Sequence, residues 1–329
     1  MCTAISMHGK NHYFGRNLDL TYHYNEAVTI TPRNYKFNFR HIGDISAHYA
    51  MIGIATTVDT YPLYYEAVNE CGLGICALNF PGNAAYFSPC SEKTNIASFE
   101  FIPWLLGHCS DTASVCSVIT NLNITDTPFN AQYLPSPLHW LVSDTEHSIV
   151  IEQMPSGLFC FDNPMHVLTN NPPFYYHCEN IHNYINVTAN EPTNRFAQSL
   201  PITPYSIGMG GIGLPGDLSS ASRFVRAAFQ LHNCVKYNTE EANVNQFFHI
   251  LRSVEQTEGC ATVDGAFEKT VYSSCCNTSK AIYYYTTYEN SQITCVNMHN
   301  ENLNGEALIC YPLRNESVFY QENKSTHPN

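Results

Sequence analysis

The chain opens with MCTAISMHGKNHYFGRNLD, residues 1–19, and this stretch organises the rest of the fold. Residues 2–7 are apolar enough for a buried strand, and the turn formers at residues 8–11 interrupt them. Residues 12–15 then have the composition of a returning strand. The stretch therefore predicts a tight N-terminal hairpin that folds FGRNLD, residues 14–19, back beside the first residues of the chain.

A cysteine stands directly after the initiator methionine, and this position can give it two functional groups. Removal of Met1 would leave Cys2 with a thiol and a free α-amino group, whose usual pKa of about 8 suits a general base at neutral pH. One residue would then supply both nucleophile and base. The hairpin would add Arg16, which favours a thiolate, and Asp19, which can orient an ammonium group. The alternatives are an ordinary thiol and a surface Arg–Asp pair of little energetic value.

The composition is that of a folded and acidic protein. Of the 329 residues, 44% are hydrophobic and 13% are charged, which favours one globular domain over residues 1–329 and excludes a disordered chain. The formal net charge of −13 and the lack of a basic run argue against nucleic acid as a partner. The end of the chain is polar, so residues 314–329 are expected to form a loose tail.

Neither a signal peptide nor a membrane span is predicted. The first apolar stretch is short and is interrupted at residues 8–11, and no window approaches the roughly 18 apolar residues that a membrane span needs. We therefore expect a cytoplasmic protein with no membrane partner. The 14 cysteines then indicate reduced thiols, most of them buried as small apolar side chains.

Hydrophobic patterning predicts a mixture of strands and helices. Strands are expected at residues 27–31, 49–57, 73–78, 138–143, 148–153, 270–275, 281–288 and 292–298. Helices are expected at residues 98–109, 112–122, 174–187, 219–235 and 242–252. This order of elements favours an α+β fold in which two layers of sheet lie between helices.

Two stretches match cofactor or metal patterns, but their context argues against both. GMGGIG at residues 208–213 matches a dinucleotide fingerprint, yet a proline follows it and no clear strand precedes it, so a loop is expected. His8 and His12 lack the intervening glutamate of a zinc-binding helix, and no C-x-x-C pair occurs. We therefore expect no metal and no cofactor.

Three polar residues later in the chain are candidates for the same site. Asn79 ends the predicted strand 73–78, and Asn170 ends a strand-like run before a proline, so both amides could donate N–H groups to an oxyanion. For Asn170, an Asx turn is the alternative. Arg223 lies near the start of a helix that Asp217 is expected to cap, where a cation opposes the helix dipole and needs a partner. That partner is either an active-site group or Asp217 itself.

Six sequence blocks in one order carry a resemblance to a known family. They are MCTAIS at residues 1–6, FGRNLD at 14–19, NECGLG at 69–74, LNFP at 78–81, LTNNP at 168–172 and GLPGDLSSASRF at 213–224. From Met1 to about Tyr311 the chain resembles the choloylglycine hydrolase family, the N-terminal-nucleophile amidases that include bile salt hydrolases and penicillin V acylases. The resemblance implies a four-layer αββα N-terminal-nucleophile hydrolase sandwich and a homotetramer.

The resemblance also implies the chemistry of the site. A cysteine would attack the amide carbonyl with its own α-amine as base, and amide groups would stabilise the oxyanion, without metal or cofactor. The implied catalytic set is Cys2 as nucleophile, Arg16 beside the thiolate, Asp19 beside the amine, Asn79 and Asn170 at the oxyanion, and Arg223 in the active site.

The implied substrates are glycine- or taurine-conjugated bile acids, and Asn79 favours them over penicillin V, for which the family tends to carry tyrosine there. The same chemistry on penicillin V or acyl-homoserine lactones is the first alternative. A non-catalytic protein that binds amphipathic acids, with Cys2 never unmasked, is the second. EQTE at residues 255–258 is more polar than the family pattern and leaves the choice of glycine or taurine open. Candidate loop residues for an aromatic steroid pocket are Tyr22, Tyr24, Tyr61, Tyr65, Phe129 and Tyr133.

Overall fold

The N-terminal hairpin forms as the sequence predicts. In the computed structural model, which describes residues 1–323, β1 (Cys2–His8) and β2 (His12–Leu20) pair antiparallel, with Cys2 opposite Leu18. β2 extends beyond the predicted end at residue 15, because it is buried along its length between β1 and a strand from the C-terminal part of the chain.

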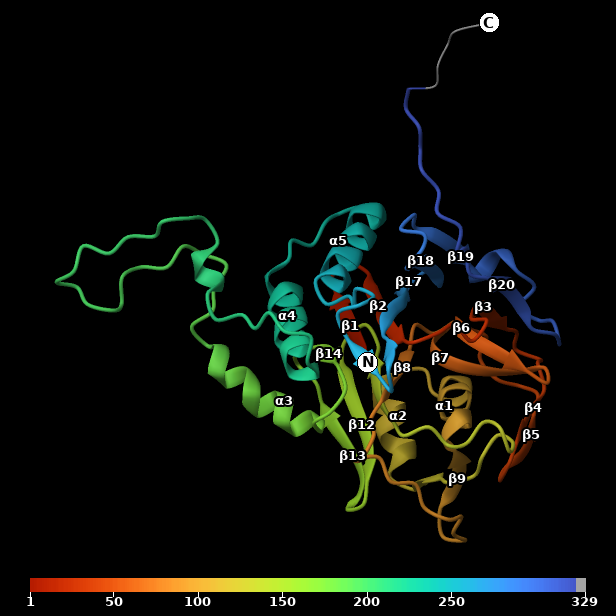
Figure 1. Ribbon diagram of the computed structural model, residues 1–329. Helices are drawn as coiled ribbons and strands as arrows, with labels where there is room; N and C mark the ends of the chain where they lie inside the picture. Colours follow the sequence, from red (N-terminus) through yellow and green to blue (C-terminus); the bar gives the residue numbers. More distant parts are fainter. Residues whose placement is uncertain (324–329) are drawn as a thin grey trace, which may run out of the picture.

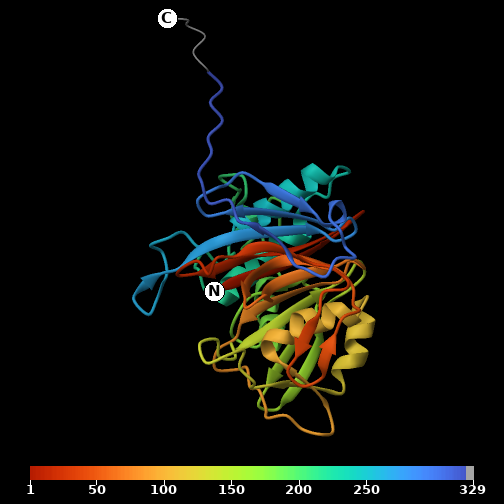
Figure 2. The same cartoon turned by 90° about the vertical axis from the view of Figure 1, so that its right-hand side faces the viewer.

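This hairpin lies inside a six-stranded sheet with the order β14-β1-β2-β17-β18-β19. The other strands are β14 (Val167–Leu168), β17 (Lys269–Asn277), β18 (Ile282–Thr287) and β19 (Thr294–Asn297), which confirms the three predicted C-terminal strands. Because β17 pairs with β2, strands from opposite ends of the sequence lie side by side, in red and blue in Figure 2.

The second sheet has eight strands in the order β13-β12-β11-β8-β7-β6-β3-β20. Their bounds are β3 (Ala27–Thr31), β6 (Met51–Val58), β7 (Tyr61–Asn69), β8 (Gly74–Asn79), β11 (Leu138–Ser143), β12 (Ser148–Met154), β13 (Gly157–Asp162) and β20 (Ile309–Pro312). Its central strands are covered on both faces, and this double burial is the reason for continuous apolar runs in the sequence instead of alternation.

Helices cover the outer face of each sheet. α4 (Ser220–Asn233) and α5 (Glu240–Arg252) pack on the six-stranded sheet, while α1 (Phe101–His108) and α2 (Thr112–Ile119) pack on the eight-stranded sheet. One apolar core joins the two sheets and continues under α4 and α5, and a second lies beneath α1 and α2. Figure 2 shows the layers stacked from teal helices at the top to gold helices at the bottom. The predicted α+β sandwich of four αββα layers is confirmed.

The remaining elements are short. In the described part of the chain, β4 (Phe37–Phe39) pairs with β5 (Gly43–Ile45), β9 (Thr94–Ala97) with β10 (Leu122–Thr125), and β15 (Thr262–Val263) with β16 (Ala266–Phe267). α3 (Phe174–Asn180) precedes a long segment, residues 185–212, that projects from the body in Figure 1. The 3₁₀ helices are Ser98–Glu100, Ile181–Tyr184, Met209–Gly211 and Met298–Asn300. Within residues 1–323, no helix is long and apolar enough to cross a membrane.

Three local predictions are wrong. Residues 61–65, predicted as a loop, begin strand β7, which pairs along β6. The helix predicted over residues 174–187 ends at Asn180 and gives way to a 3₁₀ turn. The N-cap of α4 is Ser219, whose side chain accepts a hydrogen bond from the Ser222 backbone N–H, and not Asp217.

The C-terminal segment has little regular structure. Residues 314–323 carry no helix or strand, and residues 324–329 lie outside the described part of the chain. A loose tail over residues 314–329 and a single domain over residues 1–329 stay predictions.

Candidate active site

The hairpin brings the first three predicted residues together in the interior. Cys2 is 4% exposed, and Arg16 and Asp19 are completely buried. Cys2 and Arg16 line the same cavity, while the Asp19 backbone N–H donates to the Met1 carbonyl oxygen at 3.0 Å. Burial on this scale rules out the alternative of an Arg–Asp pair on the surface.

Asn170 and Arg223, from distant parts of the sequence, both form hydrogen bonds with the Cys2 backbone. Asn170 follows β14, and β14 pairs with β1, which carries Asn170 to the start of the chain. The Asn170 Oδ1 atom accepts hydrogen bonds from the Cys2 backbone N–H at 2.7 Å and from Arg223 Nη2 at 2.9 Å. Arg223 also donates to the Cys2 carbonyl oxygen. Among residues 1–323, Arg223 forms no ion pair with Asp217, so the alternative of a local salt bridge is wrong.

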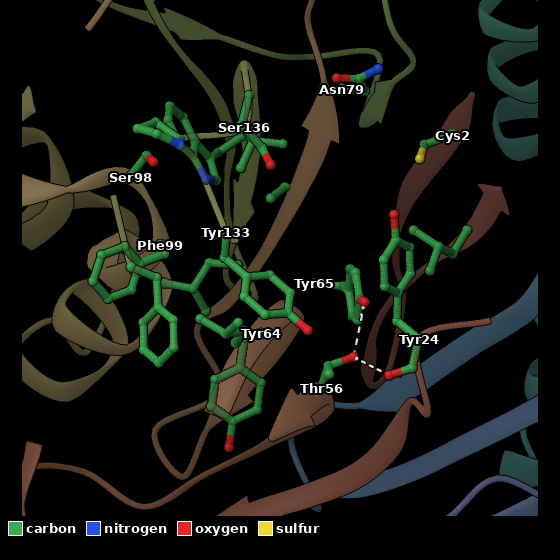
Figure 3. Close-up of a pocket in the computed structure, with 18 of the residues that line it drawn as sticks. Cys2, Tyr24, Thr56, Tyr64, Tyr65, Asn79, Ser98, Phe99, Tyr133 and Ser136 are labelled. Atoms are coloured by element: carbon green, nitrogen blue, oxygen red, sulfur yellow. Dashed lines mark hydrogen bonds between the residues drawn. The ribbon is translucent and has the colours of Figure 1, made fainter. Parts of the chain in front are cut away.

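The neighbours of Asn170 fix the orientation of its amide. Oδ1 faces Arg223 because a guanidinium has only donors, and Nδ2 donates to the Asn79 carbonyl oxygen at 2.8 Å. Any donation from the Asn170 side chain to an oxyanion would therefore use the second amide hydrogen. Asn79 ends β8 with an exposed side chain, and Figure 3 shows it at the same end of the cavity as Cys2.

Asp19 is a buried carboxylate with one unused oxygen. Its Oδ1 atom accepts a hydrogen bond from Thr270 Oγ1 at 2.6 Å, while Oδ2 has no hydrogen-bond partner within residues 1–323. Burial raises the pKa of Asp19, and the charges of Arg223 and the chain's amino terminus act in the opposite direction. The free oxygen is suited to accept a hydrogen bond from an ammonium group.

Two further carboxylates near the site were not found from the sequence. The Met1 ammonium donates to the Asp19 carbonyl oxygen at 3.1 Å and forms an ion pair with Glu268, while burial lowers the pKa of this amino group. Glu66 approaches Arg16, with Oε2 and Nη1 separated by 3.8 Å. A charge inside the mostly apolar run YPLYYEAVN, residues 61–69, is the signal that could have identified Glu66. Glu268 has no comparable signal.

Cys2 lies at one end of a cavity of about 390 Å³, which is within the usual size range of small-molecule sites. Four of the six predicted pocket residues line it, namely Tyr24, Tyr65, Phe129 and Tyr133. Figure 3 shows the rings of Tyr24, Tyr65 and Tyr133 in the part of the cavity away from Asn79. Lining residues that the sequence did not identify include Leu20, Phe99, Ile102, Leu138 and Trp140.

The other two predicted pocket residues lie outside this lining among residues 1–323. Tyr22 is 57% exposed, and its hydroxyl oxygen accepts a hydrogen bond from the Tyr24 hydroxyl at 2.6 Å. The Tyr61 ring packs against Phe129 and Phe99, with centroid distances of 5.7 Å and 5.6 Å, so it supports two lining residues from behind.

The structure places the two sequence patterns that resembled metal or cofactor sites, His8 with His12 and residues 208–213. His12 is buried and hydrogen-bonds to Ser6 Oγ and Thr278 Oγ1, both at 2.8 Å. Residues 208–213 form a loop with a 3₁₀ turn. Within residues 1–323, no group of three or more His, Cys, Asp or Glu side chains is arranged to hold a metal ion.

Comparison with known proteins decides the family. The model of the linear amide C–N hydrolases, choloylglycine hydrolase family, matches residues 2–311. The chain belongs to the choloylglycine hydrolase family. It is therefore an amide hydrolase.

Similar members of the choloylglycine hydrolase family come from several bacteria. A protein of Lactiplantibacillus plantarum named bile salt hydrolase/transferase is 52% identical over 324 residues, which cover 98% of this chain and 100% of that protein. A bile salt hydrolase/transferase of Clostridium perfringens is 38% identical, over 94% of this chain and 96% of its own length.

Solved structures show the same architecture. A conjugated bile acid hydrolase from Clostridium perfringens superposes with a TM-score of 0.92 at 36% identity, covering 98% of this chain and 100% of that structure. A penicillin V acylase from Agrobacterium tumefaciens has a TM-score of 0.75 at 16% identity, covering 93% of this chain and 90% of its own. The second likeness shows the fold alone.

Proposed function

We propose that, once Met1 is removed, this choloylglycine hydrolase family member hydrolyses the amide bond of glycine- or taurine-conjugated bile acids. The observation that carries the proposal is the position of Cys2 at one end of a largely apolar cavity. The polar groups Arg16, Asn79 and Asn170 gather at that end. The names of the similar Lactiplantibacillus and Clostridium proteins support the same substrate class.

The lining of the cavity suits a steroid that carries a few hydroxyl groups. Apolar and aromatic side chains supply most of the surface, and hydroxyl groups lie at separate points along it. Thr56 links two of the tyrosines: its Oγ1 donates to the Tyr24 carbonyl oxygen at 3.1 Å and lies 3.0 Å from the Tyr65 hydroxyl, as Figure 3 shows.

The reaction begins with proton transfer inside one residue. The Cys2 thiol gives its proton to its own α-amine, and the thiolate attacks the amide carbon to form a tetrahedral oxyanion. The Asn79 side chain and the second Nδ2 hydrogen of Asn170 are the proposed donors to that oxyanion. The ammonium then protonates the departing nitrogen of glycine or taurine and leaves a thioester. Water, deprotonated by the same amine, attacks the thioester, and the bile acid leaves as the thiol re-forms.

The surroundings of the Cys2 nitrogen support its role as the base. Asn170 Oδ1 already accepts a hydrogen bond from this nitrogen, so the direction of one N–H is set before Met1 is removed. Asp19 Oδ2 would accept a second hydrogen bond from the ammonium form. Arg223 holds both Asn170 Oδ1 and the Cys2 carbonyl oxygen, which limits rotation of the nucleophile.

We also propose that the enzyme works in the cytoplasm, as one domain per chain and as a homotetramer. All 14 cysteines are free thiols, which is usual for cytoplasmic proteins. The projecting segment 185–212 exposes apolar side chains that a second copy would bury. The most exposed of them are Ile185, Phe196, Tyr205, Ile207 and Ile212.

Intact-mass analysis combined with a glycine assay tests the function. We expect loss of Met1, alkylation of Cys2 by iodoacetamide, and release of free glycine from glycocholate that alkylation abolishes. Retained Met1 with no glycine release would overturn the hydrolase and favour a binding protein for amphipathic acids. Loss of Met1 with cleavage of penicillin V, but not of glycocholate, would replace the bile acid with another acyl amide.

A further inference from the structure

A second carboxylate lies behind the active site, away from the substrate cavity. Glu66 is on β7, is 1% exposed, and points toward the six-stranded sheet. Its Oε2 atom accepts a hydrogen bond from the Tyr272 hydroxyl at 2.7 Å, and its Oε1 atom accepts from the hydroxyls of Tyr283 and Ser274. Three hydroxyl donors around one carboxyl group occupy most of the roughly four acceptor positions of an ionised carboxylate.

Arg16 approaches this carboxylate and lines the same cavity as Cys2. Its Nη1 atom is 3.8 Å from Glu66 Oε2 and donates to the carbonyl oxygens of Ala77 and Tyr65. Its Nη2 atom is buried and has no hydrogen-bond partner within residues 1–323. Nη1 is therefore held by fixed acceptors, while Nη2 is unpaired in the described part of the chain.

We propose that Glu66 is a positioning residue that holds the Arg16 guanidinium against the Cys2 thiolate. This proposal rests on the proposed function, in which the Cys2 thiolate is the nucleophile. Glu66 touches neither substrate nor reacting atoms and acts only through Arg16. Glu66 and the carbonyl oxygens around Arg16 Nη1 fix the position of the guanidinium charge. A charge in a buried site has a large effect on the ionisation of a neighbouring thiol.

A bulge in β7 makes this arrangement possible. Glu66 pairs with Ile54, while Tyr64 pairs with Ala55, so Tyr65 is an extra residue without a partner on β6. The bulge lets Tyr65 face the cavity, where Figure 3 shows it, while its carbonyl oxygen accepts from Arg16 at 3.3 Å. Bulges often re-aim side chains beside active sites. This one lets Tyr65 line the cavity while the next residue, Glu66, approaches Arg16.

The charge of Glu66 is consistent with its surroundings. Burial raises the pKa of Glu66, and Arg16 is the main group that lowers it, followed by the hydroxyls of Tyr283 and Tyr272. Glu66 in turn favours the charged form of Arg16. Without this carboxylate, Arg16 would be a buried cation held mainly by carbonyl oxygens, which is an energetically costly state.

The test measures thiolate formation at Cys2 directly. The rate of Cys2 alkylation by iodoacetamide is followed against pH by peptide mass in the mature wild type and in Glu66→Gln. We expect the variant to need a higher pH for half-maximal alkylation, and its kcat with glycocholate to fall about tenfold or more with KM within about twofold. Glu66→Asp, which keeps the charge, should recover part of both effects.

Tyr283→Phe keeps the proposal testable even where Glu66→Gln fails to fold, because it removes one donor and leaves the carboxylate. It should shift the alkylation profile in the same direction by a smaller amount. Tyr285→Phe is the matched control on the same strand, since the Tyr285 hydroxyl contacts the Arg314 backbone N–H and not Glu66, and it should leave the profile unchanged.

Two results would overturn the proposal. Lower thermal stability with an unchanged alkylation profile in Glu66→Gln and Tyr283→Phe would give Glu66 a purely structural role. A shift to lower pH would mean that Glu66 screens Arg16 instead of holding it. Failure of the wild type to release glycine would concern the proposed function alone, because the alkylation profile needs no substrate.

Discussion

The Oδ1 atom of Asn170 lies 2.7 Å from the backbone nitrogen of Cys2, and the two residues are 168 positions apart in the sequence. The same oxygen accepts a hydrogen bond from Arg223, in the first turns of α4. The first residue of that helix, Ser220, donates from its hydroxyl to Thr169 Oγ1 and accepts from the Asn170 backbone N–H. The start of α4 therefore fixes the geometry around the nitrogen that we propose as the catalytic base.

Replacement of Asn170 should disable the enzyme without unfolding it. In Asn170→Ala the Cys2 amine loses its acceptor and Arg223 loses a partner, so we expect kcat for glycocholate hydrolysis to fall by about 100-fold or more. Asn180→Ala, at the half-buried C-terminal end of α3, is the control and should keep wild-type kcat. Glycine release and circular dichroism measure activity and folding, and an Asn170→Ala protein with full activity would contradict the assignment.

Loss of the thiol should separate catalysis from binding. Cys2→Ala removes the nucleophile but leaves the cavity, so glycine release should be abolished while glycocholate still binds. Isothermal titration calorimetry should give a Kd within about threefold of the KM of the wild type, because the apolar lining contributes most of the affinity. Residual turnover by Cys2→Ala would show that another group attacks the amide.

The two neighbouring tyrosines Tyr22 and Tyr24 should differ in their effect on substrate binding. The Tyr24 ring lines the cavity, and its loss in Tyr24→Ala removes apolar contact worth about 1–2 kcal/mol, which predicts a rise in KM of roughly 5- to 30-fold. Tyr22→Ala is a matched control, because this exposed ring lies outside the lining among residues 1–323. Equal KM values for the two variants would place the steroid elsewhere.

The stability of the fold should fall as the pH drops below 6.5. Burial lowers the pKa of His12 to about 3 and that of His166 to about 4, from an ordinary value of 6.5. Between these values the unfolded chain binds more protons than the folded one, so the free energy of unfolding decreases as the pH falls and is fully retained above 6.5.

Urea unfolding between pH 7 and pH 5 measures this dependence. His166→Gln should reduce the slope of the unfolding free energy against pH, because glutamine can still hydrogen-bond to Ser148 without titrating. The exposed Asn183→Gln, which removes no titratable group, should leave the slope unchanged. An unchanged slope in His166→Gln would show that this histidine is protonated equally in both states.

The projecting segment should control assembly. Ile207 is 95% exposed, and in the proposed homotetramer a second copy would cover it, so Ile207→Asp should convert the tetramer to smaller species. Val235→Asp, a change at an exposed site outside the segment, is the control. Light scattering coupled to size-exclusion chromatography measures the mass, and an intact Ile207→Asp tetramer would place the interface on another surface.

The sequence by itself determined the N-terminal hairpin, the strands and helices with strong patterns, and the order of the family's sequence blocks. These features are local: turn formers at residues 8–11 close the hairpin, and its short length forces Arg16 and Asp19 back toward Cys2. The family followed from the same blocks, because many short matches in one order are far more specific than any one of them.

Only the tertiary structure decided which residues meet and in what orientation. The amide of Asn170 presents its oxygen to Cys2 because Arg223, from another element, can only donate hydrogen bonds. Tyr61 and Tyr65 look alike in the sequence, yet a bulge places Tyr65 in the cavity while Tyr61 packs behind it. Strand register, side-chain direction and long-range hydrogen bonds depend on packing between distant segments, and local sequence patterns do not encode those contacts.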